Sequence, residues 1–170
     1  MIYYITGGER SGKSNYAQNL ALQLSDSPYY LATSRVWDDD HQKRIDQHIA
    51  DRDQRWVSIE EEKELSKVVK NNSVVVVDCV TLWLTNFFVD TKNDIEASLS
   101  QAKIEFDKLL QIDATIIIIS NEIGMGGHAT TEVGRKFTEL QGWMNQHIAK
   151  HAHKAILMVS GIPVEIKNSN

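Results

Sequence analysis

Residues 7–14 near the start of the chain read G-G-E-R-S-G-K-S, the G-x-x-x-x-G-K-S pattern of a phosphate-binding P-loop. Glycines let backbone N–H groups turn toward phosphate oxygens where a side chain would block the approach. Lys13 supplies a positive charge for the outer phosphates, and the hydroxyl of Ser14 can hold Mg²⁺. The pattern therefore predicts a nucleotide phosphate site formed by Gly7, Gly8, Glu9, Arg10, Ser11, Gly12, Lys13 and Ser14.

The segments around this pattern predict an α/β fold. Residues 2–6 are β-branched and aromatic, as in a strand, and residues 14–24 carry alanine and leucine at helical spacing. Several later runs are almost wholly apolar, which is typical of strands buried on both faces of a parallel sheet; they are 29–33, 73–78, 114–120 and 155–160. The remaining expected elements are a short strand at 56–59, an edge strand at 161–167, and helices at 38–51, 60–69, 80–111 (broken near 90–94) and 131–151. Strands alternating with helices indicate one P-loop domain over residues 1–170, with a mostly parallel sheet flanked by helices.

Composition narrows the classes of function. The net charge of -5 argues against a nucleic-acid-binding surface, which needs concentrated lysine and arginine. The single cysteine, Cys79, excludes an intrachain disulfide and suits a reducing compartment. No apolar stretch approaches the roughly 20 residues that span a bilayer, and the chain enters its first expected strand without a targeting segment. We therefore expect a cytoplasmic protein with no membrane span and no nucleic-acid partner.

Residues 74–78, VVVVD, form an apolar strand that ends in a carboxylate. Ligands of open α/β sheets bind at the edge where such strands end. Two interpretations are open: Asp78 holds Mg²⁺ opposite Ser14, or it caps the helix that follows.

Arg44, His48 and Arg52 are spaced four residues apart, which places them in one stripe on a helix. Two guanidinium groups beside an imidazole would keep it neutral and nucleophilic, and would attract phosphates. A solvated helix face explains the same spacing. Residues 121–127, NEIGMGG, form a glycine-rich loop that either closes over a substrate or simply connects two elements.

Together these motifs resemble one family over nearly the whole chain, the bifunctional adenosylcobinamide kinase/adenosylcobinamide-phosphate guanylyltransferases of cobalamin biosynthesis. The resemblance rests on several segments besides the strand that ends at Asp78: TGGERSGKS (6–14), LATS (31–34), RI-x-x-H-x-x-x-R-x-x-x-W (44–56), NEIGMG (121–126) and VSGIPVEIK (159–167).

The resemblance implies two reactions. The first phosphorylates the aminopropanol hydroxyl of adenosylcobinamide with ATP or GTP. The second moves GMP from GTP onto a histidine, which matches His48, and then onto the phosphate of adenosylcobinamide-phosphate, giving adenosylcobinamide-GDP and pyrophosphate. Lys13 would serve both reactions.

The resemblance also implies binding residues and an assembly. Mg²⁺ would bind at Ser14 and Asp78, the sheet would be RecA-like, and the enzyme would be a homotrimer. Outside the P-loop, the family's nucleotide contacts correspond to Thr33, Ser34, Arg35, Ile49, Ala50, Asp51, Arg52, Glu60 and Asp78.

Two other functions remain as alternatives. One is a small P-loop kinase or NTPase in which His48 has no covalent role. The other is a non-enzymatic nucleotide switch, although the chain lacks the guanine-reading N-K-x-D motif that such proteins carry.

Overall fold

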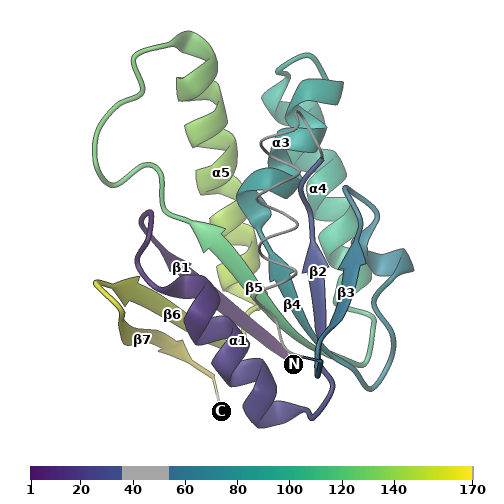
Figure 1. The fold of residues 1–170 in the computed structure, drawn as a ribbon. Helices are drawn as coiled ribbons and strands as arrows, with labels where there is room; N and C mark the ends of the chain where they lie inside the picture. Colours follow the sequence, from purple (N-terminus) through teal and green to yellow (C-terminus); the bar gives the residue numbers. More distant parts are fainter. Residues whose placement is uncertain (36–53, 170) are drawn as a thin grey trace.

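The computed structural model describes residues 1–35 and 54–169, which form a seven-stranded sheet with the order β3-β2-β4-β5-β1-β6-β7 (Figure 1). The strands are β1 (Ile2–Gly7), β2 (Tyr29–Ala32), β3 (Val57–Glu60), β4 (Val74–Asp78), β5 (Thr115–Asn121), β6 (Lys154–Val159) and β7 (Ile162–Asn168). Of these seven strands only β7 runs antiparallel to its neighbour, and it forms one edge of the sheet, with β3 at the other. The predicted α/β class, with a mostly parallel sheet, is confirmed.

Helices cover both faces of the sheet (Figure 1). The helix α1 (Lys13–Leu24) packs on one face, while α3 (Val80–Asp90), α4 (Ile95–Leu109) and α5 (Glu132–His151) pack on the other. Alternate residues of the central strands feed the two resulting cores, which explains why their sequences are apolar throughout. Within the described ranges, no helix is both long and apolar enough to cross a membrane.

The predicted break in the segment 80–111 is confirmed. Between α3 and α4 the chain adopts positive φ angles at Lys92 (56°) and Asn93 (66°), which end the first helix. The carboxylate of Asp94 then accepts a hydrogen bond from Ala97 N at 2.9 Å and caps the second helix.

The helix predicted for residues 60–69 is wrong, because this segment contains only a short 3-10 helix, Leu65–Lys67. The Glu61 carboxylate accepts hydrogen bonds from the backbone N–H groups two and three residues later. Two backbone carbonyls of the segment accept hydrogen bonds from Trp83 and Asn86 of α3. These carbonyls are therefore engaged by side chains rather than by the α-helical ladder. The helix expected at 38–51 lies outside the described residues.

Candidate nucleotide-binding site

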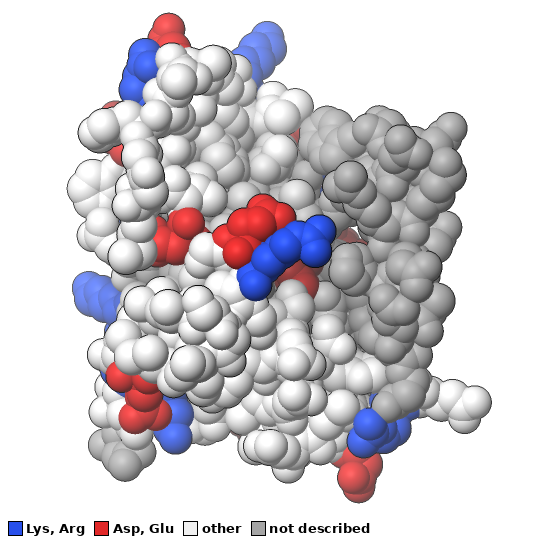
Figure 2. Space-filling view, turned by 60° about the vertical axis from the view of Figure 1, so that its left-hand side comes forward, with Lys and Arg blue, Asp and Glu red and all other residues white. Residues whose placement is uncertain are grey.

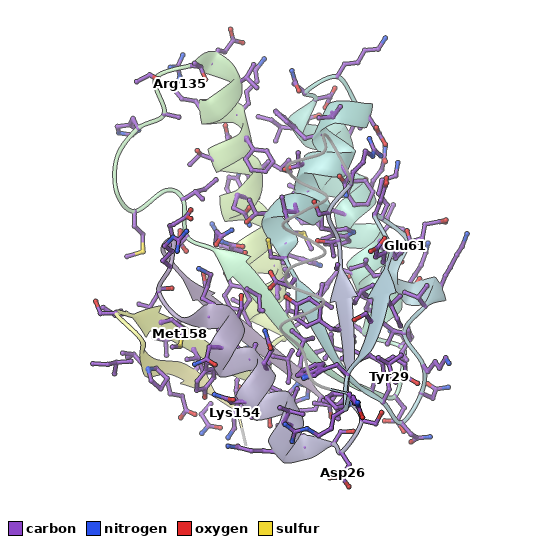
Figure 3. All side chains as sticks on the ribbon, viewed as in Figure 1. Asp26, Tyr29, Glu61, Arg135, Lys154 and Met158 are labelled. Carbon is purple, nitrogen blue, oxygen red and sulfur yellow. The ribbon has the colours of Figure 1, made fainter. Side chains whose placement is uncertain are left out.

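The P-loop, residues 7–14, connects the C-terminal end of β1 to the start of α1. Gly12 has a φ of 94°, and a Cβ atom there would lie 3.2 Å from Gly161 Cα. A Cβ at Gly7 would lie 2.6 Å from Met158 O on β6, which Figure 3 labels. Gly161 N also donates a hydrogen bond to Ser11 O at 3.0 Å. The turn between β6 and β7 thus supports the loop from one side.

Lys13 is the first residue of α1, and its side chain returns over the loop. Its Nζ donates to Gly8 O at 2.6 Å and lies 3.4 Å from Ser11 Oγ. Burial lowers the pKa of the ammonium group, while the nearby Asp78 and Glu9 act in the opposite direction. A phosphate in the loop would stabilise the charged form of this lysine, as the P-loop pattern predicts.

Asp78 at the end of β4 faces the start of α1. Ser14 Oγ donates to Asp78 Oδ2 at 3.1 Å, and the Tyr30 hydroxyl donates to the same oxygen. The interpretation of Asp78 as a helix cap is wrong, since Cys79 occupies the N-cap of α3 and no side chain caps that helix. A hydroxyl and a carboxylate side by side are oxygen ligands of the kind that Mg²⁺ prefers.

Sequence reasoning missed Tyr30, which is 5% exposed. A signal was present: a tyrosine inside an apolar strand needs a partner for its hydroxyl, and β2 lies directly beside β4. This need for a partner could have directed the search to the pair of Tyr30 and Asp78, the carboxylate that ends β4.

A second group of candidate residues lies at the ends of β2 and β3. In the sheet Ala32 pairs with both Asp78 and Glu60, so Glu60 and the residues that follow Ala32 lie at the same edge as Asp78. Thr33 is fully buried, and its hydroxyl donates to Cys79 O at 2.8 Å and accepts from Cys79 N at 2.9 Å. Ser34 and Glu60 line a pocket of about 750 Å³.

Arg35 carries a dense set of ion pairs. Its Nε lies 2.7 Å from Glu62 Oε2, and its two terminal nitrogens bind the Asp90 carboxylate at 3.0 and 3.2 Å. Lys63 Nζ lies 2.6 Å from the same carboxylate. Hydrogen bonds from Arg35 and Lys63 hold the pKa of Asp90 well below its ordinary value, and Asp90 and Glu62 raise the pKa of Arg35. Sequence reasoning missed Asp90, although a carboxylate as the last residue of a helix opposes the helix dipole and so calls for a cation nearby.

The P-loop and Glu60 lie far apart along one edge of the sheet, and Asp78 at the end of β4 lies between them. In Figure 3 the labelled residues Met158, beside the P-loop, and Glu61, just beyond β3, are on opposite sides of the molecule. The strands β5, β4 and β2 separate β1 from β3, so four strand spacings amount to roughly 19 Å. The structure therefore brings Lys13, Ser14 and Asp78 together, and separately Ser34, Arg35 and Glu60.

The predicted loop after β5 leaves the sheet next to the P-loop. Asn121 Nδ2 donates to Thr81 Oγ1 at 3.0 Å, and Glu122 N donates to Gly7 O at 3.0 Å. Beyond this anchor the chain is exposed, with Met125 at 76%. The remaining candidates, Arg44, His48, Ile49, Ala50, Asp51 and Arg52, lie outside the described residues.

The family model described as "Cobinamide kinase / cobinamide phosphate guanyltransferase" matches residues 3–166 of the chain. The chain belongs to this family. As a member of the cobinamide kinase/guanylyltransferase family, it has both activities and acts in cobalamin biosynthesis.

Relatives of known name agree in length with this family member. The "Bifunctional adenosylcobalamin biosynthesis protein CobU" of Escherichia coli is 33% identical over 98% of this chain and 100% of its own length. The protein of the same name from Salmonella typhimurium is 32% identical over the same shares. The "Bifunctional adenosylcobalamin biosynthesis protein CobP" of Pseudomonas aeruginosa is 32% identical over 96% of this chain and 95% of its own. Among solved structures, the flagellar accessory protein FlaH from Methanocaldococcus jannaschii matches with a TM-score of 0.47 and 15% identity, over 98% of this chain and 78% of its own.

Proposed function

We propose that the P-loop holds the triphosphate of ATP or GTP and that Lys13 is the catalytic cation in both reactions. The observation that carries this proposal is the meeting of Lys13, Ser14 and Asp78 at one end of the sheet, with Ser14 Oγ 3.1 Å from Asp78 Oδ2. In the kinase reaction the acceptor hydroxyl oxygen attacks the γ-phosphorus and its proton passes to solvent. The bond to the β–γ bridging oxygen breaks, and the nucleoside diphosphate leaves with that electron pair. Lys13 neutralises charge on the phosphate oxygens during this transfer.

Ser14 and Asp78 would hold Mg²⁺, which supplies further neutralisation of phosphate charge when it is bound. Two features support this assignment: the oxygen atoms of both side chains lie within hydrogen-bond distance, and the Tyr30 hydroxyl fixes the carboxylate. Tyr30 therefore orients Asp78 toward the phosphate site.

Ser34, Arg35 and Glu60 form the guanosine end of the site in this proposal, next to the buried Thr33. A carboxylate such as that of Glu60 can accept hydrogen bonds from N1–H and the exocyclic amino group of guanine, which adenine does not offer. Support comes from the pocket of about 750 Å³ beside Ser34 and Glu60. A GTP molecule with its phosphates at Lys13 would extend along the edge of the sheet toward this pocket.

His48 is the proposed nucleophile for guanylyl transfer, with Ile49, Ala50, Asp51 and Arg52 contacting the nucleotide; the support is the family resemblance of this segment. The imidazole nitrogen attacks the α-phosphorus of GTP, a P–N bond forms, and pyrophosphate leaves with the electron pair of the broken P–O bond. A phosphate oxygen of adenosylcobinamide-phosphate then attacks the same phosphorus, and the P–N bond breaks to restore the neutral histidine.

Labelling with GTP that carries the label in its α-phosphate tests the covalent step. The proposal expects a labelled protein whose adduct is acid-labile and alkali-stable, and which disappears in His48→Ala. The same variant should keep its kinase activity, because no step of the kinase reaction uses this imidazole. If His48→Ala keeps full guanylyl-transfer activity, the covalent role of His48 is refuted. The alternative, a P-loop enzyme in which His48 has no covalent role, would then be the better explanation.

We also propose a homotrimer, whose support is the exposed apolar face of the edge strand β7. Ile162, Val164 and Ile166 alternate along this strand and are 65%, 44% and 56% exposed. Figure 2, turned so that the left-hand side of Figure 1 comes forward, shows wide uncharged areas between a central group of acidic and basic side chains and further charged groups at the margins. The buried, unbridged Cys79 suits a reducing compartment, so we extend the proposal to a cytoplasmic location.

A further inference from the structure

One face of α3 binds the chain segments that carry the proposed guanosine contacts. Trp83 Nε1 donates to Lys63 O at 3.0 Å. One turn later, Asn86 Nδ2 donates to Thr33 O at 2.8 Å and to Glu62 O at 2.9 Å. A single amide nitrogen thus joins the segment after β2 to the segment after β3.

Asn86 is a polar residue in apolar surroundings. It is 0% exposed, and its neighbours Phe87 and Phe88 belong to the apolar core. Its Oδ1 atom has no hydrogen-bond partner among the residues that the structure describes, and an unpaired buried acceptor destabilises the fold. The amide therefore carries a cost that its two bonds to backbone carbonyls must offset.

The two carbonyls that Asn86 binds belong to residues close in sequence to the proposed guanosine contacts. Ser34 directly follows Thr33, and Glu60 lies two residues before Glu62. Glu61 N also donates to Ala32 O at 3.1 Å, so both segments leave the sheet side by side. Beyond that last bond of the ladder, two contacts hold the segments together: the buried amide of Asn86, and the more exposed ion pair between Arg35 and Glu62.

We propose that Asn86 is a positioning residue for guanosine recognition, because it sets the spacing between Ser34 and Arg35 on one segment and Glu60 on the other. This inference rests on the proposed function, in which these three residues contact guanosine. Phosphate binding depends less on Asn86, because Lys13 and the rest of the P-loop follow β1, which β5, β4 and β2 separate from β3. The nearest link between them runs through Thr33, which bonds to Cys79 and to the backbone of Asp78.

The test compares two ligands that share only their phosphates: GTP and inorganic tripolyphosphate, each titrated calorimetrically with Mg²⁺ into the whole protein. Asn86→Ala should weaken GTP binding about tenfold and change tripolyphosphate binding by less than about twofold. Discrimination of GTP against ATP should fall with it. Ser98→Ala is the matched control, since Ser98 on α4 is also 0% exposed and, within the described ranges, its hydroxyl bonds to the nearby Asp94 O and Thr91. This variant should bind both ligands as the unmodified protein does.

The outcomes distinguish a failure of this inference from a failure of the proposed guanosine contacts. If Asn86→Ala keeps its GTP affinity, or if both ligands weaken equally, Asn86 has no positioning role and the inference is overturned. If the unmodified protein binds GTP no more tightly than tripolyphosphate, the guanosine contacts of the proposed function fail first, and the inference falls with them.

Should Asn86→Ala fail to fold, hydrogen exchange on the unmodified protein tests whether guanosine binding acts on both segments that Asn86 joins. GTP should slow exchange at the amides of both Thr33 and Glu61 more than tripolyphosphate does, because these amides lie on the two joined segments. Protection of one amide without the other would show that the segments respond separately, and would overturn the inference.

Discussion

The ammonium group of Lys13 binds a carbonyl of its own P-loop, where we expect it to bind phosphate when a nucleotide is present. The side chain is 7% exposed and its ammonium group donates to Gly8 O. Burial of a cation costs free energy, which the P-loop carbonyl and the nearby Asp78 carboxylate partly offset. An arriving phosphate offers a stronger partner, so the lysine is ready to exchange one acceptor for another.

Replacing Lys13 tests whether one cation serves both reactions. Lys13→Ala should lower the rate of phosphorylation and of guanylyl transfer by at least about a hundredfold, since both transition states lose the same charge stabilisation. Rates of the two half-reactions, measured separately with purified protein, check this. Lys67→Ala is the control, because Lys67 is exposed and its ion pair among the described residues is with Glu64, three positions away. Loss of one activity alone would mean that the reactions use different phosphate sites.

The depressed pKa of Asp90 makes a prediction about pH. Its ordinary pKa is 3.8, and the value in the folded protein is lower, so the pairing stabilises the fold above pH 3.8 and is lost as pH falls through the folded value. Asp90→Asn should therefore lower the melting temperature by about 2 °C at pH 7, a modest effect because the pair is partly exposed to solvent. The difference should shrink at pH 3 and at high salt.

Melting temperatures of the unmodified protein and of Asp90→Asn, measured at pH 7 and pH 3, check this prediction. Asp26→Asn, in the exposed turn after α1, provides a comparison in which the effect of the charge change should be small at both pH values. A difference for Asp90→Asn that grows on acidification would show that its ion pairs do not stabilise the fold.

At the scale of elements, α5 contains two glycines that the structure distinguishes. A Cβ at Gly142 would meet open space, whereas a Cβ at Gly134 would lie 2.9 Å from Thr131 Oγ1 and 3.0 Å from Ala129 Cβ. Gly142→Ala should stabilise the protein by about 0.5–1 kcal/mol, because alanine loses less backbone entropy in a helix. Gly134→Ala should destabilise it, because Thr131 caps the helix through Gly134 N. Denaturant unfolding of both variants checks the signs, and an equal response would contradict the steric argument.

Elements defined by local patterns were predictable from the sequence. Apolar runs identified β4 and β5, and the P-loop pattern located β1 and α1, because a parallel sheet and a glycine loop each impose a local sequence requirement. The segment after β3 was not predictable, since side chains of α3, 20 and 24 positions later, bind its carbonyls. The ion pairs of Asp90 were missed for a similar reason: its partner Arg35 is 55 residues away in the chain. The sequence around a residue does not indicate contacts with residues so far away in the chain.

At the scale of the whole molecule, the edge strand β7 leaves an apolar surface exposed. The strand β7 forms the edge beside β6, and its apolar row has no cover among the described residues. An exposed, apolar edge strand invites association with other chains. The turn that joins β6 to β7 also contacts the P-loop through Gly161 N, so whatever binds β7 lies one turn away from the phosphate site.

A charge placed on this face tests the proposed trimer. If β7 lies in the subunit interface, Ile166→Lys removes an apolar contact worth about 1.5–3 kcal/mol and places an unpaired charge in each interface. We expect a trimer for the unmodified protein and a folded monomer for the variant at micromolar concentration, as measured by size-exclusion chromatography with light scattering. Val133→Lys, at a similarly exposed apolar site on α5, should remain trimeric. A variant at Ile166 that stays trimeric would place the interface elsewhere, and a monomeric unmodified protein would exclude the trimer itself.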